Sequence, residues 1–287
     1  MVMLADSDIT TREVLEWQGL HLLHGRISSC SQKLRIFLNL KNIAWQGHEM
    51  NLAESETYTD WFLGINPRGL VPVLVWDGAV HIESNDIMAL LDAASPEPRL
   101  IPSSEAGDIS ALLGREDDLH LDLRALSFRF VLGRTGSNKT ADMMDRYRSG
   151  GRTVMGAPDQ EKRSHEIDFY ERLATEGISD ATACAAAAKF RASFDQLEQR
   201  LATGPYFLGE TISVLDIAWF VYASRLQFGG YPFQRLHPRV HAWRERLATD
   251  DRFAGEVTPP APVQDIIAKN REAMAQAGTT MVEITGL

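Results

Sequence analysis

The first half of the chain alternates short extended patterns with amphipathic helical ones. Three apolar runs have the length and composition typical of strands, at residues 20–23, 71–76 and 79–82, and a further extended stretch covers residues 46–52. Three segments carry apolar side chains on one helical face, at residues 31–41, 57–63 and 84–94. Asp77-Gly78 between the last two runs predicts a tight hairpin turn, and Ser84 is placed to cap the helix that follows. Residues 19–95 are therefore predicted to fold as β-α-β-α-β-β-α.

The second half is helical almost throughout. Three prolines between residues 96 and 102 cannot continue a helix and favour an extended linker. Beyond them, helical patterns cover residues 109–132, 181–202, 217–222 and 238–247. Ser213 and Asp216 have the spacing of a capping box before the third of these helices. The polar, glycine-containing stretch 133–165 lies between the first two helices and is either a functional lid or a mobile insertion.

These patterns predict a two-domain chain with additions at both ends. Residues 1–18 are polar and acidic without a clear period, so we expect the fold to begin after them. The predicted parts are an N-terminal extension (1–18), an α/β domain (19–95), a linker (96–104), an all-helical domain (105–258) that includes the polar insertion 133–165, and a C-terminal tail (259–287).

Composition narrows the classes of partner. The 287 residues have a formal net charge of −10, which repels nucleic acid phosphates and anionic lipid surfaces. No apolar run approaches the roughly 20 residues that a membrane helix needs, and no secretory leader pattern opens the chain. Two cysteines without C-x-x-C spacing form no disulfide framework. We therefore expect a protein of the reducing cytoplasm, without nucleic acid or membrane partners.

The most informative local feature is Ser28-Ser29-Cys30-Ser31 at the predicted start of a helix. Unpaired backbone N–H groups and the helix dipole stabilise anions there, including a thiolate. A serine hydroxyl can donate to a bound thiolate, and the cysteine can itself become a nucleophile. The alternative is that Ser28 and Ser29 only cap the helix.

Two further segments also allow either a ligand-binding role or an ordinary structural role. Pro72 removes a ladder donor at a strand entry, and a cis Val71-Pro72 bond would turn the Val71 backbone N–H and C=O toward an extended peptide ligand. A plain edge-strand proline is the alternative. Glu83-Ser84 precedes a helix, where Ser84 either binds a carboxylate or serves as an ordinary N-cap.

The order of these motifs resembles a known family. Residues 65–74, Ile-Asn-Pro-Arg-Gly-Leu-Val-Pro-Val-Leu, followed by Glu83-Ser84, are similar to the thioredoxin-like domain of cytosolic glutathione transferases. The helical half with its Ser213-x-x-Asp216 box is similar to their C-terminal domain. Ser-Ser-Cys at 28–30 resembles the zeta class, which implies Ser28 as the hydroxyl that activates glutathione sulfur and Cys30 as an assisting or alternative thiol. The insertion and the tail after Pro259 make the chain longer than the zeta class, and Asn66-Pro-Arg-Gly69 with the polar insertion is more similar to bacterial β-etherases, where the active hydroxyl would lie nearer Ser31.

The resemblance also implies a function. Glutathione would be the co-substrate, with its γ-glutamyl carboxylate at Glu83-Ser84 and its cysteinyl backbone at Val71-Pro72; Ser29 and Ser31 would complete the site. Its thiolate would attack a hydrophobic, aromatic electrophile, including β-aryl ethers, in a homodimeric enzyme. A zeta-like glutathione-dependent isomerase is the alternative reaction, and a non-catalytic interaction protein of the same fold is the alternative class.

Other residues favour structural roles. His237 and His241 have a metal-ligand spacing, but Pro238 after His237 indicates an ordinary helix entry, so no metal is predicted. Cys184 lies in an alanine-rich helix and is expected to pack as a small apolar residue. Four basic residues of the insertion are either solvated or part of a lid over an anionic or aromatic substrate: Lys139, Arg146, Arg148 and Arg152.

Overall fold

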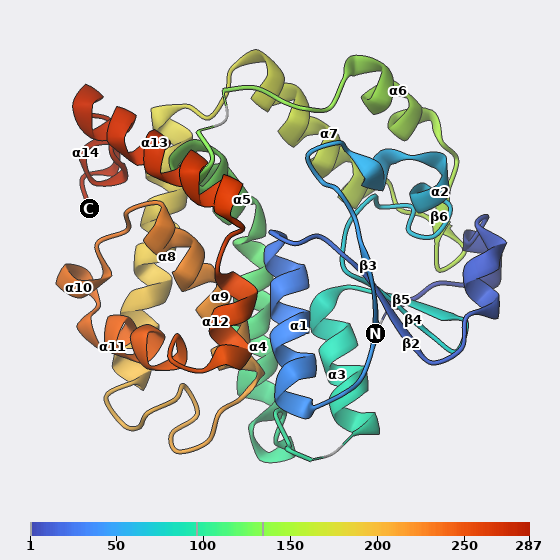
Figure 1. The fold of residues 1–287 in the computed structure, drawn as a ribbon, viewed down its shortest axis with the longest axis horizontal. Coiled ribbons are helices and arrows are strands. Elements are labelled where there is room, and N and C mark those ends of the chain that lie inside the picture. The colour runs from blue at the N-terminus through green and yellow to red at the C-terminus, as the bar shows by residue number, and fades with distance from the viewer. Residues whose placement is uncertain (1, 96, 134) are drawn as a thin grey trace. The chain divides into compact units, whose positions relative to one another are not determined.

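The computed structural model describes residues 2–95, 97–133 and 135–287, and the chain forms two compact units. The first unit contains the described residues up to Ser95 together with Gly136–Thr175, and the second contains the rest (Figure 1). Sequence analysis placed the insertion in the helical domain, whereas the structure places residues 136–175 with the α/β fold. Pro96, where the predicted linker begins, and position 134 of the predicted insertion lie outside the described residues.

The predicted β-α-β-α-β-β-α order is present in the first unit. Its elements are β2 (Leu20–His24), α1 (Ser29–Lys41), β3 (Gln46–Glu49), α2 (Asp60–Leu63, after a 3-10 turn at Glu56–Tyr58), β4 (Val73–Trp76), β5 (Ala79–Ile82) and α3 (Ser84–Ala94). The sheet order is β1-β5-β4-β2-β3, with β2 parallel to β3 and the other pairs antiparallel. Asp77 and Gly78 both adopt positive φ in the hairpin turn, as their sequence predicts. This confirms the thioredoxin-like fold.

The prediction that the fold begins after residue 18 is wrong. Strand β1 (Val2–Met3) pairs with β5 at the edge of the sheet. Leu4, Ile9 and Val14 are buried in the same core as the sheet residues. The 3-10 turn Asp6–Asp8 lies between Leu4 and Ile9, and Val14 lies within a second 3-10 turn, Arg12–Glu16. The irregular spacing of these apolar residues explains why no strand or helix period is visible in the sequence.

The inserted segment (residues 136–175) is regular and packs on the first unit. It consists of α6 (Ala141–Ser149), the short strands β6 (Thr153–Val154) and β7 (Ala157–Pro158), and α7 (Gln160–Thr175). Met144, Tyr147 and Ile167 form one apolar cluster with Leu63 of α2, and Val154 joins the core under the sheet. This apolar contact is one of two kinds of attachment to the first unit; the ion pair between Arg68 and Asp159 belongs to the other.

The second unit is all-helical, as predicted. Its elements are a 3-10 turn (Ser103–Glu105), α4 (Ala106–Asp118), α5 (His120–Leu126), a π-helical turn (Ser127–Val131), α8 (Asp180–Arg200), α9 (Val214–Phe228), α10 (Phe233–Leu236), α11 (Pro238–Leu247), α12 (Asp251–Val257), α13 (Ala261–Ala277) and α14 (Met281–Thr285). The helix predicted over 109–132 is interrupted at Leu119, which has φ −86° and ψ 1°.

Helix α9 forms the centre of this unit because nearly all of its residues are buried. Asp216 completes the predicted capping box with Ser213 and also accepts from the Trp243 indole N–H at 3.0 Å. Burial raises the Asp216 pKa to about 6, although these hydrogen bonds oppose the shift. Across the described residues, no helix combines the length and the apolar character needed to cross a membrane.

Candidate functional site

The strand register brings the three predicted site segments to one edge of the sheet. Leu23 near the end of β2 pairs with Val73 at the start of β4, and β5 ends at Ile82 on the other side of β4. The loop that enters α1, the Val71-Pro72 bond and the Glu83-Ser84 pair therefore all follow or precede strands at the same edge. A single extended peptide ligand could therefore contact all three segments.

Ser28 occupies the N-cap of α1. It is half-buried, and its Oγ accepts from the Ser31 backbone N–H at 3.3 Å. A hydroxyl that accepts one hydrogen bond still has a proton to donate. Capping and donation to a thiolate are therefore compatible roles for Ser28, and the two readings of this motif do not compete.

The neighbours of Ser28 differ in their access. Ser31 is fully buried, and its Oγ accepts from the Gly25 backbone N–H at 3.2 Å, so it serves the loop before the helix. Ser29 is buried as well. Cys30 is half-buried, lies in the first turn of α1 and is not in a disulfide. Ser28 and Cys30 are thus the two partly accessible side chains of the motif.

Arg35 fixes the loop that carries Ser28, a role that sequence reasoning missed. Its guanidinium is buried and donates to the carbonyls of Gly25 at 3.2 Å and Arg26 at 3.0 Å. It also lies 3.1 Å from His24 Nδ1. The sequence signal was an arginine within the apolar pattern of a helix, where a charge needs buried partners.

The Val71-Pro72 peptide bond is cis, which is the first of the two alternatives that the sequence left open. The preceding turn is held by Asn66, whose side-chain amide donates to the Leu70 carbonyl at 2.7 Å and accepts from the Arg68 N–H at 3.1 Å. Gly69 in this turn has φ +65°. An added Cβ there would lie 3.2 Å from the Thr57 carbonyl oxygen, so the turn favours glycine.

The expectation that Ser84 caps α3 is corrected by the structure. Glu83 occupies the N-cap position, with φ +69°, and makes no side-chain capping bond. Ser84 is the first helical residue and is buried. Its hydroxyl and the open N–H groups of the first turn have the chemistry that a carboxylate requires.

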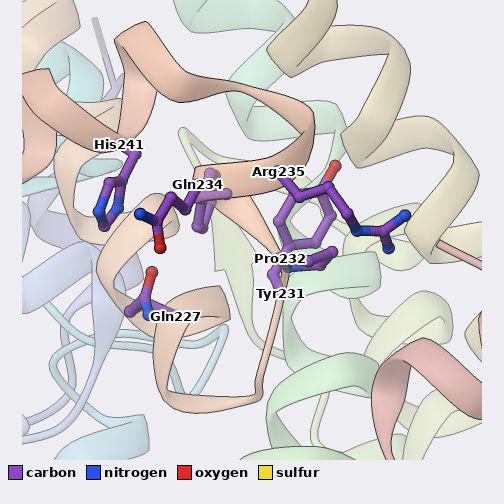
Figure 2. Close-up of a pocket in the computed structure, with 7 residues that line it drawn as sticks. Gln227, Tyr231, Pro232, Gln234, Arg235 and His241 are labelled. Atoms are coloured by element: carbon purple, nitrogen blue, oxygen red, sulfur yellow. The ribbon is translucent and has the colours of Figure 1, made fainter.

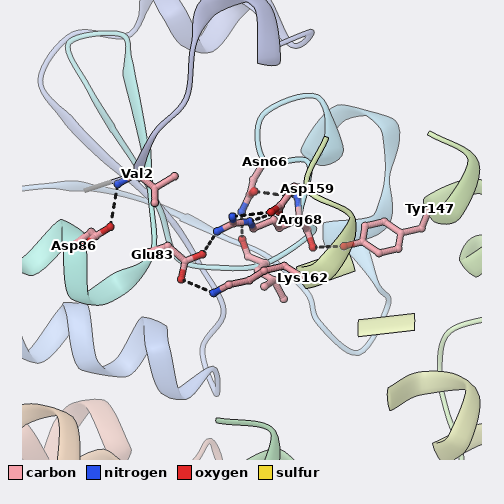
Figure 3. A network of polar contacts seen from close by, with 9 residues as sticks. Val2, Asn66, Arg68, Glu83, Asp86, Tyr147, Asp159 and Lys162 are labelled. Carbon is pink, nitrogen blue, oxygen red and sulfur yellow. Dashed lines mark hydrogen bonds and ion pairs between the residues drawn. The ribbon is translucent and has the colours of Figure 1, made fainter. Parts of the chain in front are cut away.

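Arg68 joins Glu83 to the inserted segment (Figure 3). Its Nη1 pairs with Glu83, while Nε and Nη2 donate to the two oxygens of Asp159 at 2.5 and 3.1 Å. The Tyr147 hydroxyl donates to the Arg68 carbonyl at 2.9 Å. Burial would lower the pKa of Arg68, but the hydrogen bonds and charges of Asp159 and Glu83 raise it overall. Local patterns could not reveal these long-range pairs.

The basic residues of the insertion take up structural positions within the first unit. Lys139 is buried, with its ammonium 4.0 Å from the centre of the Tyr58 ring. Arg146 and Arg148 pair with Asp142 and Asp145 of the same helix. Arg152 lies 3.3 Å from Asp60 at the start of α2. Arg146 and Arg148 are therefore solvated surface pairs, which is one of the two alternatives from the sequence, whereas Lys139 is buried.

The second unit has a separate cavity of about 390 Å³, lined by α10 and the two residues before it together with residues of α9 and α11 (Figure 2). Gln227, Gln234 and His241 are among its lining residues, and no predicted site residue is. The neighbouring His237 is buried with Nε2 3.0 Å from Asp195, at the N-cap of α11, and Pro238 is the first helical residue. This confirms the ordinary helix entry predicted there. Cys184 Sγ lies 3.2 Å from the Ile284 carbonyl.

Both halves of the chain match models of one family. The N-terminal domain model of glutathione S-transferases matches residues 27–94, and their C-terminal domain model matches residues 167–246. Together the two matches cover about half of the chain and include the Ser28–Ser31 motif, the cis Val71-Pro72 bond and Glu83-Ser84. The chain belongs to the glutathione S-transferase superfamily.

Curated relatives match the chain over part of their length. The chain is 41% identical over 76 residues to a zeta-class glutathione S-transferase of Euphorbia esula, covering 26% of this chain and 34% of the relative. It is 36% identical over 80 residues to a maleylpyruvate isomerase of a Ralstonia species, covering 28% of this chain and 38% of the relative. The chain thus matches little more than a third of the length of these relatives.

The overall fold is similar to solved transferases of the superfamily. The β-etherase LigF from Sphingobium sp. strain SYK-6 superposes with a TM-score of 0.65 at 23% identity, covering 87% of this chain and 99% of that one. At this identity the likeness is one of fold. It confirms the combination of a thioredoxin-like domain with an all-helical one.

Proposed function

We propose that this member of the superfamily is an enzyme that binds glutathione, and that the thiolate of the bound glutathione attacks a hydrophobic, aromatic electrophile. The observation that carries the proposal is Ser28 at the N-cap of α1, partly accessible and with a proton left to donate. The helix N-terminus and this donor both favour the thiolate over the thiol, so more nucleophile is present at neutral pH. Cys30, two residues after Ser28 in the first turn of α1, is the alternative group for activating the glutathione sulfur.

The rest of glutathione would follow the same sheet edge. Its cysteinyl backbone pairs with the Val71 backbone next to the cis bond, and its γ-glutamyl carboxylate accepts from Ser84. In the transfer step the sulfur lone pair forms a bond to the electrophilic carbon. The bond from that carbon to its leaving group breaks, and the leaving group departs with the electron pair, as a phenolate from a β-aryl ether.

A glutathione-dependent isomerase is the second candidate. It is favoured by the Ser-Ser-Cys motif at 28–30 and by the named isomerase among the relatives. In that reaction glutathione is regenerated, so the amount consumed per product separates the two candidates. We also propose that the protein is a homodimer and that it works in a reducing cytoplasm. Light scattering on the purified chain would test the dimer.

Replacing Ser28 tests the proposal directly. A hydrogen bond to a charged group contributes about 1.5–3 kcal/mol, so Ser28→Ala should lower kcat with an aryl halide or a β-aryl ether roughly 10- to 100-fold. The pKa of bound glutathione, followed by thiolate absorbance, should rise by about one to two units. Ser28→Thr keeps a hydroxyl and should retain most of the activity.

Two outcomes would contradict this assignment. Full activity in Ser28→Ala together with its loss in Cys30→Ala would move the role to the thiol. No glutathione binding by calorimetry to the wild-type chain would reject both enzymatic candidates. Ser84→Ala is expected to weaken glutathione binding while leaving the thiol pKa of bound glutathione unchanged, because Ser84 contacts the other end of the peptide.

A further inference from the structure

The inserted segment reaches the residue that precedes Ser84. Lys162 of α7 has its Nζ 3.7 Å from Glu83 Oε2, while the other oxygen of Glu83 accepts from Arg68 (Figure 3). A separation of 3.7 Å is longer than a hydrogen bond, and an exposed pair of this kind holds its partners weakly. The Lys162 side chain is 48% exposed. Its ammonium can therefore turn from Glu83 to a ligand at little cost.

Arg68 cannot play the same part. Its side chain is 9% exposed, and its guanidinium is committed to both oxygens of Asp159 and to Glu83. Removing any of these bonds would leave a buried charge without its partner. Within the part of the chain that the structure describes, Lys162 is thus the half-exposed cation beside Glu83.

Helix stability does not explain the position of Lys162. It lies in the first turn of α7 (Gln160–Thr175), where a cation is disfavoured by the helix dipole. The interaction with Glu83 offsets that cost only in part, because the pair is long and partly exposed. A negatively charged group bound next to Glu83 would give this lysine a stronger partner.

The charges around Glu83 also fit one kind of ligand. Arg68 and Lys162 balance Glu83 and Asp159, so the network has no excess charge. The γ-glutamyl end of glutathione carries one ammonium and one carboxylate on the same carbon. A zwitterion leaves the balance unchanged, and each of its groups finds an opposite charge: the carboxylate at Lys162 and the ammonium at Glu83.

We infer that Lys162 is a glutathione-binding residue supplied by the inserted segment, whose ammonium donates to the γ-glutamyl α-carboxylate held at Ser84. The inference rests on the proposed function, since it assigns a further group to the same site. It gives the insertion a role in selecting peptides that begin with a zwitterionic residue. Asp159 supports this role as a positioning residue, because it holds Arg68 and through it Glu83.

The test compares two peptides and two charge-removing variants by calorimetry. The peptides are glutathione and 4-aminobutyryl-Cys-Gly, which lacks only the γ-glutamyl α-carboxylate. Lys162→Gln should raise the Kd of glutathione about three- to tenfold and leave the Kd of the second peptide unchanged. Lys162→Arg should retain most of the affinity because it keeps the charge.

Arg148→Gln is the matched control. Arg148 lies in the same segment, its side chain is 47% exposed, and it pairs with Asp145 and Glu171 of that segment. Its removal should change neither Kd. The inference is overturned if Lys162→Gln binds glutathione as wild type does, or if it weakens both peptides equally. If the wild-type chain binds no glutathione, the proposed function fails first and the role of Lys162 fails with it.

Discussion

The inserted segment 136–175 and the C-terminal tail 259–287 are held to their units by different kinds of contact. Besides its apolar cluster, the insertion is joined to the first unit by polar anchors: the Arg68–Asp159 pair and Asp8, which accepts from the Thr153 hydroxyl at 2.5 Å. The tail is joined to the second unit by apolar burial, with Met281 only 1% exposed, and by hydrogen bonds of Leu287 with Arg235 and of Asn270 with the Arg129 carbonyl. Both segments read as additions to the two predicted domains, and both form regular elements.

The difference shows how attachment chemistry decides what a segment responds to. Charged anchors need complementary partners at fixed positions, so a single lost partner is costly and pH matters. An apolar anchor loses free energy in proportion to the volume removed and is insensitive to pH and salt. The insertion should therefore be the more easily detached of the two by a change of charge, and the tail by a change of size.

Removing the charge of Arg68 should have the largest effect on the insertion. Arg68→Met leaves the carboxylates of Asp159 and Glu83 without their buried partner. Breaking such a pair costs about 3–5 kcal/mol, so the free energy of opening of residues 136–175, measured by hydrogen exchange, should fall by that amount. The second unit should keep its protection.

The control for this variant is Arg148→Met. Its ion pairs lie at the surface, with side-chain exposures of 47% to 70%, and should change stability by no more than about 0.5 kcal/mol. Equal effects of the two substitutions would show that charge pairing does not hold the insertion in place.

Shortening Met281 tests the apolar anchor of the tail. Met281→Ala removes a side chain that is 1% exposed and should cost about 2–4 kcal/mol in the free energy of unfolding of the second unit. The cost should be the same at low and high salt. Ile266→Ala in α13 is the comparison, since Ile266 is 46% exposed and its loss should be small. A strong salt dependence for Met281→Ala would contradict the apolar assignment.

The sequence predicted those elements whose pattern is local. Asp77-Gly78 specifies its own turn, Pro238 marks the start of α11, and the 3.6-residue period of residues 181–202 gives α8 within two residues at each end. The prediction for residues 1–18 was wrong because Leu4, Ile9 and Val14 reach the core from a segment without a regular helix or strand period. The burial of such residues depends on tertiary contacts, which the local sequence pattern does not reveal.

The candidate site divides in the same way. Ser28, Cys30, Val71 and Ser84 could be proposed because each lies within a recognisable short motif. Arg68 could not, since its partner Asp159 is 91 residues away in the chain. The placement of the insertion depended on such pairs and was therefore predicted in the wrong unit.

The smallest effect is expected at the second charged anchor, Asp8. Its buried carboxylate accepts from Thr153 Oγ1 at 2.5 Å and from the Gly156 N–H at 3.0 Å. Burial raises its pKa, but hydrogen bonds from Thr153 and from the backbone of Ala5, Gly156 and Met155 outweigh burial and lower the pKa overall. Asp8→Asn keeps the shape and loses the charge, so it should cost about 1–2 kcal/mol at pH 7.

The sign of the pH dependence follows from the direction of this shift. Because the folded pKa of Asp8 lies below its unfolded value, the carboxylate contributes its full stability above a pH of about 4 and loses it as the pH falls through the folded pKa. Hydrogen exchange of the Gly156 amide should therefore differ between wild type and Asp8→Asn at pH 7, and the difference should shrink on acidification as the wild-type carboxyl becomes neutral. A difference that stays constant down to acid pH would mean that Asp8 holds the insertion by shape rather than by charge, and the contrast with the tail would then rest on Arg68 alone.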